Sequence, residues 1–324
     1  MGESETKRIT DIREGESFRG FYVLSRCDLK EYDGGFRLDI ELSDASGAVP
    51  GVVWDNARDL ARECERGMVV IIQGRMLTYN DRPQVKVEKI RPAESKEYDT
   101  AWFLPETPED TESLKKQVSD YVASITDPDL GRLARIIFEN EQVMREFKHA
   151  PGGTKWHHPY LGGLLEHTIG VTGICEYVAG CHPQLNRDLL VLAGLLHDIG
   201  KIRELNATTS IEYSDEGRLE GHIVLGERFV RNMCERLEDF PPKLKMLLSH
   251  MMLSHQGKHE FSTPVEPMIP EAFVLYYADE IDSKLNALSR IAVKNEGKPW
   301  SDFVKLLGRF IYLDRDEGAG EQDS

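Results

Sequence analysis

The sequence predicts a two-domain protein in which an all-β N-terminal domain is followed by an all-α C-terminal domain. Within residues 1–95, apolar and polar residues alternate as they do in strands with one buried face. From Ser113 onward, apolar residues recur every three to four positions, which is the spacing of amphipathic helices. Residues 96–112 carry prolines and acids without periodicity and predict a linker. The 324 residues are enough for two separate cores.

The N-terminal pattern predicts five strands and one helix. An Asp-Gly-Gly turn at residues 33–35 joins the first two strands, and a turn at Asn80–Asp81 joins the last two. Three strands, a helix and two further strands form the order of a five-stranded OB barrel. The predicted elements are strands at residues 20–32, 36–44, 48–55, 68–79 and 83–90 and a helix at residues 56–67.

This barrel is expected to bind single-stranded nucleic acid. The stretches "LDIELSDASGAVPGVVWD" and "GMVVIIQGRM" resemble OB-fold nucleic-acid-binding domains. Such barrels stack bases on exposed aromatic side chains beside basic residues. Two aromatics also fit a core role, since Phe36 alternates with core residues and Trp54 fits inside a barrel. The expected contacts are Tyr22, Phe36, Arg37, Trp54, Arg75 and Tyr79.

The C-terminal domain, residues 113–314, is expected to be a helical bundle. Each predicted helix shows a three-to-four-residue apolar spacing. The acidic residues 315–324 have the composition of a disordered tail. The predicted helices cover residues 114–125, 130–140, 164–180, 187–200, 222–237, 242–253, 271–291 and 300–311.

The stretch "LAGLLHDIGK" ends an apolar segment with His197 and Asp198. An aspartate is almost never fully buried unless it is paired or binds a metal. His167 lies upstream and Asp279 downstream, each within an apolar helical stretch. Imidazole nitrogens and carboxylate oxygens suit divalent transition metals, and a helical bundle can direct them inward from separate helices. These four residues therefore predict a metal site, and a capping role for Asp198 beside a core histidine is the alternative.

In this order, the four residues resemble the H…HD…D pattern of the HD-domain metal-dependent phosphohydrolases. The resemblance implies a second metal held by His222, His250 and His255, with Asp198 as the bridge. Two adjacent metals can bind a phosphodiester and activate a water, so no serine or cysteine nucleophile is required. Catalysis is then expected at His197, Asp198 and Lys201. Lys201 either reaches a phosphate oxygen or is an exposed lysine at a helix end.

A glycine-rich approach to His167 carries further polar side chains. Glycines allow the backbone to come close to a ligand, so these side chains are candidates to hold a phosphate or a sugar. A plain loop is the alternative. The candidates are Lys155, His157, His158 and Tyr160.

The order of an OB barrel, a linker and an HD domain resembles the YhaM-type 3′–5′ exoribonucleases over about residues 10–312. The motifs that carry the resemblance are "HHPYLGGLLEHT", "LLHDIGK", "EGHI", "LSHQGK" and "YYADEIDSK". It implies that the protein degrades single-stranded RNA with two Mn²⁺ ions per chain. Mg²⁺, Fe²⁺ or Zn²⁺ stay open as the metal, and single-stranded DNA stays open as a further substrate. One position departs from the pattern, because Gln256 stands where a second histidine is expected.

Two other functions stay open on the sequence alone. One is hydrolysis of a small nucleotide, and the other is nucleic-acid binding with an inert HD centre. The net charge of −16 opposes binding by bulk electrostatics. Five cysteines without CxxC spacing indicate reduced thiols, and the sequence lacks an apolar run of the ~18 residues that a bilayer requires. We expect a cytoplasmic protein with no membrane partner, and homo-oligomers stay open.

Overall fold

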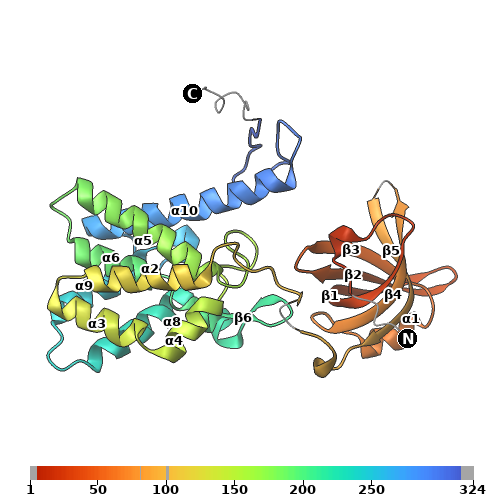
Figure 1. Ribbon diagram of the computed structural model, residues 1–324, viewed down its shortest axis with the longest axis horizontal. Coiled ribbons are helices and arrows are strands. Elements are labelled where there is room, and N and C mark those ends of the chain that lie inside the picture. Colours follow the sequence, from red (N-terminus) through yellow and green to blue (C-terminus); the bar gives the residue numbers. More distant parts are fainter. Residues whose placement is uncertain (1–5, 81, 100–101, 315–324) are drawn as a thin grey trace.

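A computed structural model describes residues 6–80, 82–99 and 102–314 of the chain. Its N-terminal part is a strand domain and its C-terminal part is a helical domain (Figure 1). The predicted tail, residues 315–324, and the turn residue Asp81 lie outside the described residues. No helix of the described part combines the length and the apolar character that a membrane crossing requires.

The strand domain is a closed five-stranded barrel in the order β1-β2-β3-β5-β4. Along β2, Leu38, Ile40 and Leu42 point inward and are fully buried, so the alternating pattern is confirmed there. A short parallel contact between β3 and β5, with Gly51 opposite Val85, closes the barrel. The elements are β1 (Ser17–Tyr32), β2 (Gly35–Asp44), β3 (Gly47–Val53), α1 (Ala57–Glu63), β4 (Val69–Tyr79) and β5 (Arg82–Pro92).

The helical domain packs its helices around α5 and α6, whose apolar side chains form the centre of one large core. A small hairpin, β6 (Leu205–Ala207) and β7 (Ile211–Tyr213), lies between α7 and α8. The helices are α2 (Thr111–Ser124), α3 (Pro128–Phe138), α4 (Glu141–His149), α5 (Gly163–Cys181), α6 (Arg187–Leu196), α7 (Lys201–Glu204), α8 (Asp215–Glu235), α9 (Pro242–Ser254) and α10 (Pro270–Lys294).

One predicted helix is wrong, and two observed helices, α4 and the short α7, were not predicted. Residues 300–311 form no helix but fold back on themselves, with Trp300 paired to Tyr312. Their apolar side chains have no core to face, since Phe303 and Leu306 are more than half exposed, and an isolated short helix is marginal in water. Helix α4 starts at an Asn140 cap, which the sequence analysis placed at the end of the preceding helix.

The described residues of the segment that joins the domains contact both domains. Phe103 packs on Val23 and Val69 of the barrel. Further along, the backbone N–H of Thr107 donates to the carbonyl of Leu161 at 2.8 Å, beside the start of α5. The segment therefore contacts the barrel at its first end and the helical domain at its second. The domains also touch through Thr209, whose hydroxyl donates to the carbonyl of Gly67 at 2.9 Å.

Gly200, of the "HDIGK" stretch, is the point where the chain after α6 meets α8. A Cβ atom at this position would overlap the carbonyl oxygen of His222 and lie 2.6 Å from the amide nitrogen of Gly226. Only glycine therefore allows the two backbones to approach this closely. This approach brings His222 next to Asp198.

We predict that Gly200→Ala lowers the free energy of unfolding by about 2–3 kcal/mol, because backbone atoms rather than flexible side chains block the added methyl group. Gly180→Ala is the matched control, since Gly180 is exposed in α5 and an added Cβ meets open space. It is expected to change stability by less than about 1 kcal/mol, in the stabilising direction. Urea unfolding measures both, and an unchanged midpoint for Gly200→Ala would contradict the prediction.

Candidate metal centre and nucleic-acid surface

The carboxylate of Asp198 lies at the centre of a buried cluster of histidines. Asp198 follows the end of α6 and is 2% exposed. One of its oxygens, Oδ2, lies 3.4 Å from His167 Nε2 and 3.5 Å from His197 Nε2. The other, Oδ1, lies 3.4 Å from His222 Nε2 and 3.5 Å from His255 Nε2. The carboxylate thus stands between two pairs of imidazoles, one pair at each oxygen.

All four histidines direct Nε2 at this carboxylate. In each ring Nδ1 lies against an oxygen that can only accept, so Nδ1 donates there, and in the neutral ring the lone pair is on Nε2. His167 Nδ1 lies 2.6 Å from Asp282 Oδ2, and His222 Nδ1 lies 2.9 Å from Glu204 Oε1. Backbone carbonyls accept from the other two rings, Gly194 from His197 at 2.8 Å and Met252 from His255 at 2.8 Å.

Convergence of four imidazoles on a buried carboxylate fits a cation site. Nε2 of His167 and Nε2 of His197 lie only 3.2 Å apart. The Nε2 atom of His255 is buried and has no hydrogen-bond partner among the described residues. Asp279 Oδ1 lies 3.2 Å from His167 Nε2 and adds a second carboxylate.

The cluster fits two divalent metals. Its donor atoms fall into two groups, and within each group the atoms lie within 4.8 Å of one another. A set of imidazoles and carboxylates suits Mn²⁺, Fe²⁺ or Zn²⁺, and Asp198 offers one oxygen to each side. Partners that hold Nδ1 are the usual outer-shell support of metal-ligating histidines. The two groups are His167, His197 and Asp279, and Asp198, His222 and His255.

His250 does not join the cluster, so its prediction as a metal ligand is wrong. Its Nε2 accepts the backbone N–H of Met268 at 2.9 Å. At 100° per residue, five positions along a helix rotate a side chain by about 140°, so His250 and His255 cannot face the same point. Gln256, at the departure from the expected pattern, places its amide nitrogen 3.1 Å from His222 Nε2 and donates to it.

Lys201 is the cation nearest to Asp198. Its Nζ lies 2.6 Å from Asp198 Oδ2 and donates to the carbonyl of Gly152 at 2.6 Å, so it is a buried lysine and not an exposed one. Burial alone would raise the pKa of Asp198, but the charge of Lys201 holds it well below its usual range. Burial would likewise lower the pKa of Lys201, and the Asp198 carboxylate raises it.

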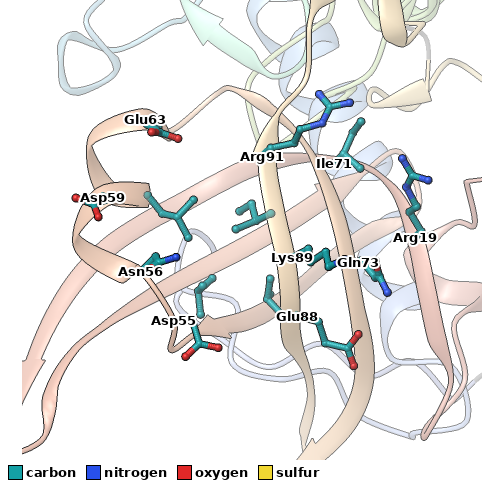
Figure 2. Close-up of a pocket in the computed structure, with 14 residues that line it drawn as sticks. Arg19, Asp55, Asn56, Asp59, Glu63, Ile71, Gln73, Glu88, Lys89 and Arg91 are labelled. Carbon is teal, nitrogen blue, oxygen red and sulfur yellow. The ribbon is translucent and has the colours of Figure 1, made fainter.

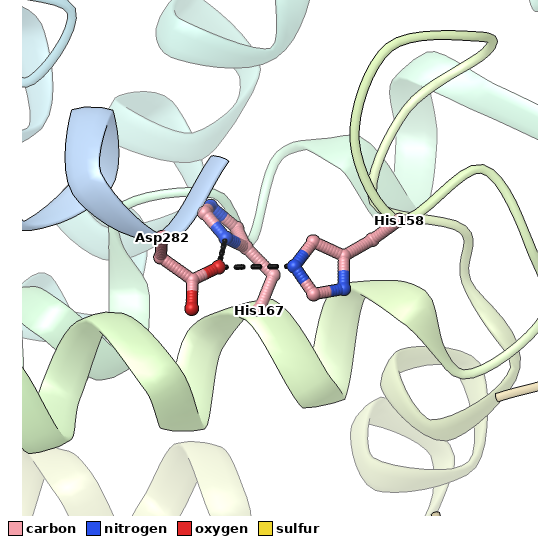
Figure 3. A group of neighbouring side chains, drawn as sticks. All are labelled: His158, His167 and Asp282. Atoms are coloured by element: carbon pink, nitrogen blue, oxygen red, sulfur yellow. Dashed lines mark hydrogen bonds and ion pairs between the residues drawn. The ribbon is translucent and has the colours of Figure 1, made fainter. Parts of the chain in front are cut away.

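His158 and Tyr160 support the cluster from behind, which corrects their prediction as substrate contacts. Figure 3 shows His158 and His167 both directed at Asp282. The Nε2 of His158 donates to Asp282 Oδ2 at 3.0 Å, and the Tyr160 hydroxyl lies 2.9 Å from His158 Nδ1 and 3.0 Å from Glu166 Oε1. Both side chains are buried and hydrogen-bonded within the protein, so neither faces a ligand.

The sequence analysis missed the two carboxylates that hold these rings, Asp282 and Glu204. Burial opposes ionisation of Asp282, but its hydrogen bonds with His158 and His167 hold its pKa well below the usual range. A signal for Asp282 was present, because it follows Asp279 by three positions and therefore shares a face of α10. Glu204 follows Lys201 by the same spacing on α7.

A pocket of about 590 Å³ opens above Asp198, Asp279 and Lys201. His157 lines this pocket, and its buried Nδ1 has no hydrogen-bond partner among the described residues. Burial lowers the pKa of His157 to about 2. Lys155 is exposed and is not among the residues that line the pocket. The remaining lining residues are Trp156, Gln256, Phe261, Ser262, Tyr276, Glu280, Ser283, Lys284, Leu306, Leu307 and Arg309.

Three of the predicted nucleic-acid contacts meet in one groove of about 370 Å³ on the barrel. Trp54 and Tyr79 are 47% and 65% exposed, so both rings are available for stacking. Arg37 lies beside them and forms an ion pair of 3.0 Å with Asp39. Two further cations, Arg26 and Lys86, also line the groove. Exposed aromatic rings interleaved with cations can bind a single strand.

Three other barrel residues lie away from this groove. Tyr22 is fully buried and donates its hydroxyl to the Lys7 carbonyl at 2.9 Å, so its prediction as a base contact is wrong. Phe36 packs partly against the barrel core, and the guanidinium of Arg58 lies 3.8 Å from the centre of its ring. Arg75 is exposed but donates to the Gly15 carbonyl at 2.7 Å. Of the six predicted residues, only Arg37, Trp54 and Tyr79 line the groove.

A second hollow on the barrel, of about 740 Å³, lies between α1 and β5 (Figure 2). Asp55, Asp59 and Glu63 line it on the α1 side, and Lys89 and Arg91 line it on the β5 side. Acids and bases are therefore mixed, and no basic track for a nucleic-acid backbone results.

We predict that His255→Ala weakens metal binding at the group of Asp198, His222 and His255. Loss of a residue that only supports a ligand costs ~10–100-fold in metal affinity, and loss of a ligand should cost more. His250→Ala is the matched control on the same helix end and is expected to keep the full metal content. Equilibrium dialysis against Mn²⁺ followed by elemental analysis measures both. Equal metal loss in the two variants would show that the assignment of His255 over His250 is wrong.

Two family models match the chain. Residues 164–284 match the model described as an HD domain, and residues 21–93 match the model described as an OB-fold nucleic acid binding domain. The HD match spans the candidate ligands from His167 to Asp279. The OB-fold match spans most of the five strands.

Among solved structures, the barrel is similar to the second OB-fold domain of replication protein A from Methanococcus maripaludis, at 15% identity and a TM-score of 0.25 over 28% of this chain and 97% of that one. It is also similar to a single-stranded DNA-binding protein of Streptomyces coelicolor, at 11% identity and a TM-score of 0.22 over 25% and 95% of the two chains. On the two family matches, this chain contains an OB-fold nucleic acid binding domain at residues 21–93, followed by an HD domain at residues 164–284.

Proposed function

We propose that the protein is a metal-dependent 3′–5′ exonuclease that hydrolyses single-stranded RNA. One observation carries the proposal. Asp198 lies between two sets of imidazole lone pairs at the base of an open pocket. A shared carboxylate between two adjacent metals is the arrangement expected for phosphodiester hydrolysis. The 3′–5′ direction and the preference for RNA come from the likeness to the YhaM-type enzymes.

The chain's own residues have distinct tasks in this proposal. Bound metals supply Lewis-acid stabilisation of a phosphate and lower the pKa of a coordinated water. His167, His197, His222 and His255 would hold the metals through Nε2, since Nδ1 of each ring is engaged by an acceptor. Lys201 holds Asp198 in place and lines the pocket, where its Nζ is a donor for a phosphate oxygen. We propose two Mn²⁺ ions, with Mg²⁺, Fe²⁺ or Zn²⁺ as substitutes.

The barrel supplies affinity for a polymer. Its groove with Trp54, Tyr79 and Arg37 supports binding of a single strand by stacking, which is tolerant of sequence. Single-stranded DNA has the same bases and phosphates, and we propose it as a second substrate. We propose that the enzyme acts in the cytoplasm, as a monomer or as a homo-oligomer.

A second candidate function has one observation in its favour. The pocket of about 590 Å³ has the size of sites that hold a small molecule, so hydrolysis of a single nucleotide also fits it. The exposed aromatic groove on the barrel favours the polymer, because a small nucleotide gains nothing from a distant stacking surface.

Incubation of the protein with Mn²⁺ and a 5′-labelled single-stranded RNA tests the proposal. We predict a ladder that shortens from the 3′ end and that disappears when EDTA removes the metal. Asp198→Asn, which cannot bridge two metals as a carboxylate does, should reduce cleavage to background. Internal cuts, or hydrolysis of free nucleotides with intact RNA, would overturn the exonuclease assignment.

A further prediction separates the groove from the metal centre. Trp54→Ala and Tyr79→Ala should each weaken binding of a long single strand by about 5–150-fold, the loss of one stacked base. Hydrolysis of bis-p-nitrophenyl phosphate should stay unchanged, because this small ester needs only the metal centre. Tyr177→Ala, which removes a 75% exposed ring from α5, is the control for both readouts. Unchanged affinity in both groove variants would contradict the role of the groove.

A further inference from the structure

The pocket above the metal centre has an aromatic wall that the proposed function does not use. Tyr276 lies on α10, one turn before the candidate ligand Asp279, and both side chains line this pocket. Its ring is half-buried, so part of it stays open to the pocket. An aromatic ring therefore stands next to the place where a phosphodiester would be cleaved.

Gly257 fixes the place of this ring. The glycine has a φ of +79°, and a Cβ atom on it would overlap the Tyr276 ring, lying 2.5 Å from Cζ. Both the backbone conformation and the space therefore require glycine. The ring of Tyr276 packs directly on the backbone at Gly257, which limits its movement. A ring whose position is fixed loses little conformational entropy when a base stacks on it.

The rest of the wall matches a nucleotide. Trp156 and Phe261 add aromatic surface, and Leu306 and Leu307 add aliphatic surface. Lys284 lines the same pocket one turn after Glu280, with which it forms an ion pair. Apolar and aromatic walls above a phosphate-binding floor are the arrangement that a nucleotide requires, since the base is planar and the phosphate is charged.

We propose that Tyr276 is the stacking platform for the base of the 3′-terminal nucleotide, and that Gly257 is the residue that positions it. The inference rests on the proposed function, because it places the terminal phosphodiester at Asp198 and Asp279. Every base has a π-face, so such a platform accepts all four nucleotides. It also aligns the end of the strand with the metals, which the distant barrel groove cannot do alone.

Binding measured without cleavage tests the platform. The full chain, stripped of metal with EDTA, is titrated with single-stranded RNA whose 3′-terminal base is 2-aminopurine, a base whose fluorescence falls on stacking. Wild type and Tyr276→Phe should quench the probe, while Tyr276→Ala and Gly257→Ala should lose most of the quenching. Tyr177→Ala is the control, because this ring is 75% exposed on α5 and is not among the residues that line the pocket. Full quenching by Tyr276→Ala would overturn the inference.

Kinetics with Mn²⁺ give a second readout. Tyr276→Ala should raise KM by about 5–150-fold for an ordinary RNA and leave KM unchanged for an RNA with an abasic 3′-terminal residue. An equal loss on both substrates would mean a structural role and would overturn the platform. Loss of quenching in Tyr276→Ala in a protein that cleaves no RNA would instead retain the platform and reject the exonuclease. Recovery of KM in Tyr276→Phe excludes misfolding as the cause.

Discussion

Burial of one ionised carboxylate, that of Asp198, is the constraint on which the helical domain depends. An unpaired buried charge is costly, so cations have to surround it. Within the described residues, Lys201 is the one lysine or arginine in contact with this carboxylate. The candidate ligands come from separate helices, with His167 on α5, His222 on α8 and Asp279 on α10. The site therefore exists only when the whole bundle is folded.

A second layer of residues decides which ring atoms face Asp198. Because Asp282, Glu204 and two backbone carbonyls accept from Nδ1, each imidazole presents its Nε2 to Asp198. The layer continues from Asp282 through His158 and Tyr160 to Glu166, which accepts from Thr107 in the segment between the domains. The orientation of His167 is thus connected by hydrogen bonds to the segment that leads from the barrel. A change in that segment can reach the metal centre along this path.

The sequence predicted which residues form the buried cluster better than it predicted their surroundings, for a physical reason. His197 and Asp198 end an apolar stretch, and a polar pair in such a place is visible in one dimension. Their outer partners are not visible, because a carbonyl or carboxylate becomes an acceptor only when tertiary packing brings a ring to it. The helical rotation between His250 and His255 was also visible in the sequence. It excludes that both side chains face one metal site, and the sequence analysis did not use it. On the barrel, Tyr22 is an aromatic residue of the type that can stack on a base, and only the closed sheet shows that it points inward.

The acidity of the chain gives two separate aromatic surfaces a use in the proposed nuclease activity. With a net charge of −16, the protein as a whole repels a polyanion, and attraction has to come from local groups. The barrel groove offers Arg26 and Lys86 beside its exposed rings, and the pocket offers Lys201. Stacking is not weakened by net charge as phosphate binding is, so rings at both places would hold a strand where cations are few. Repulsion elsewhere then keeps the strand from binding where no reaction occurs.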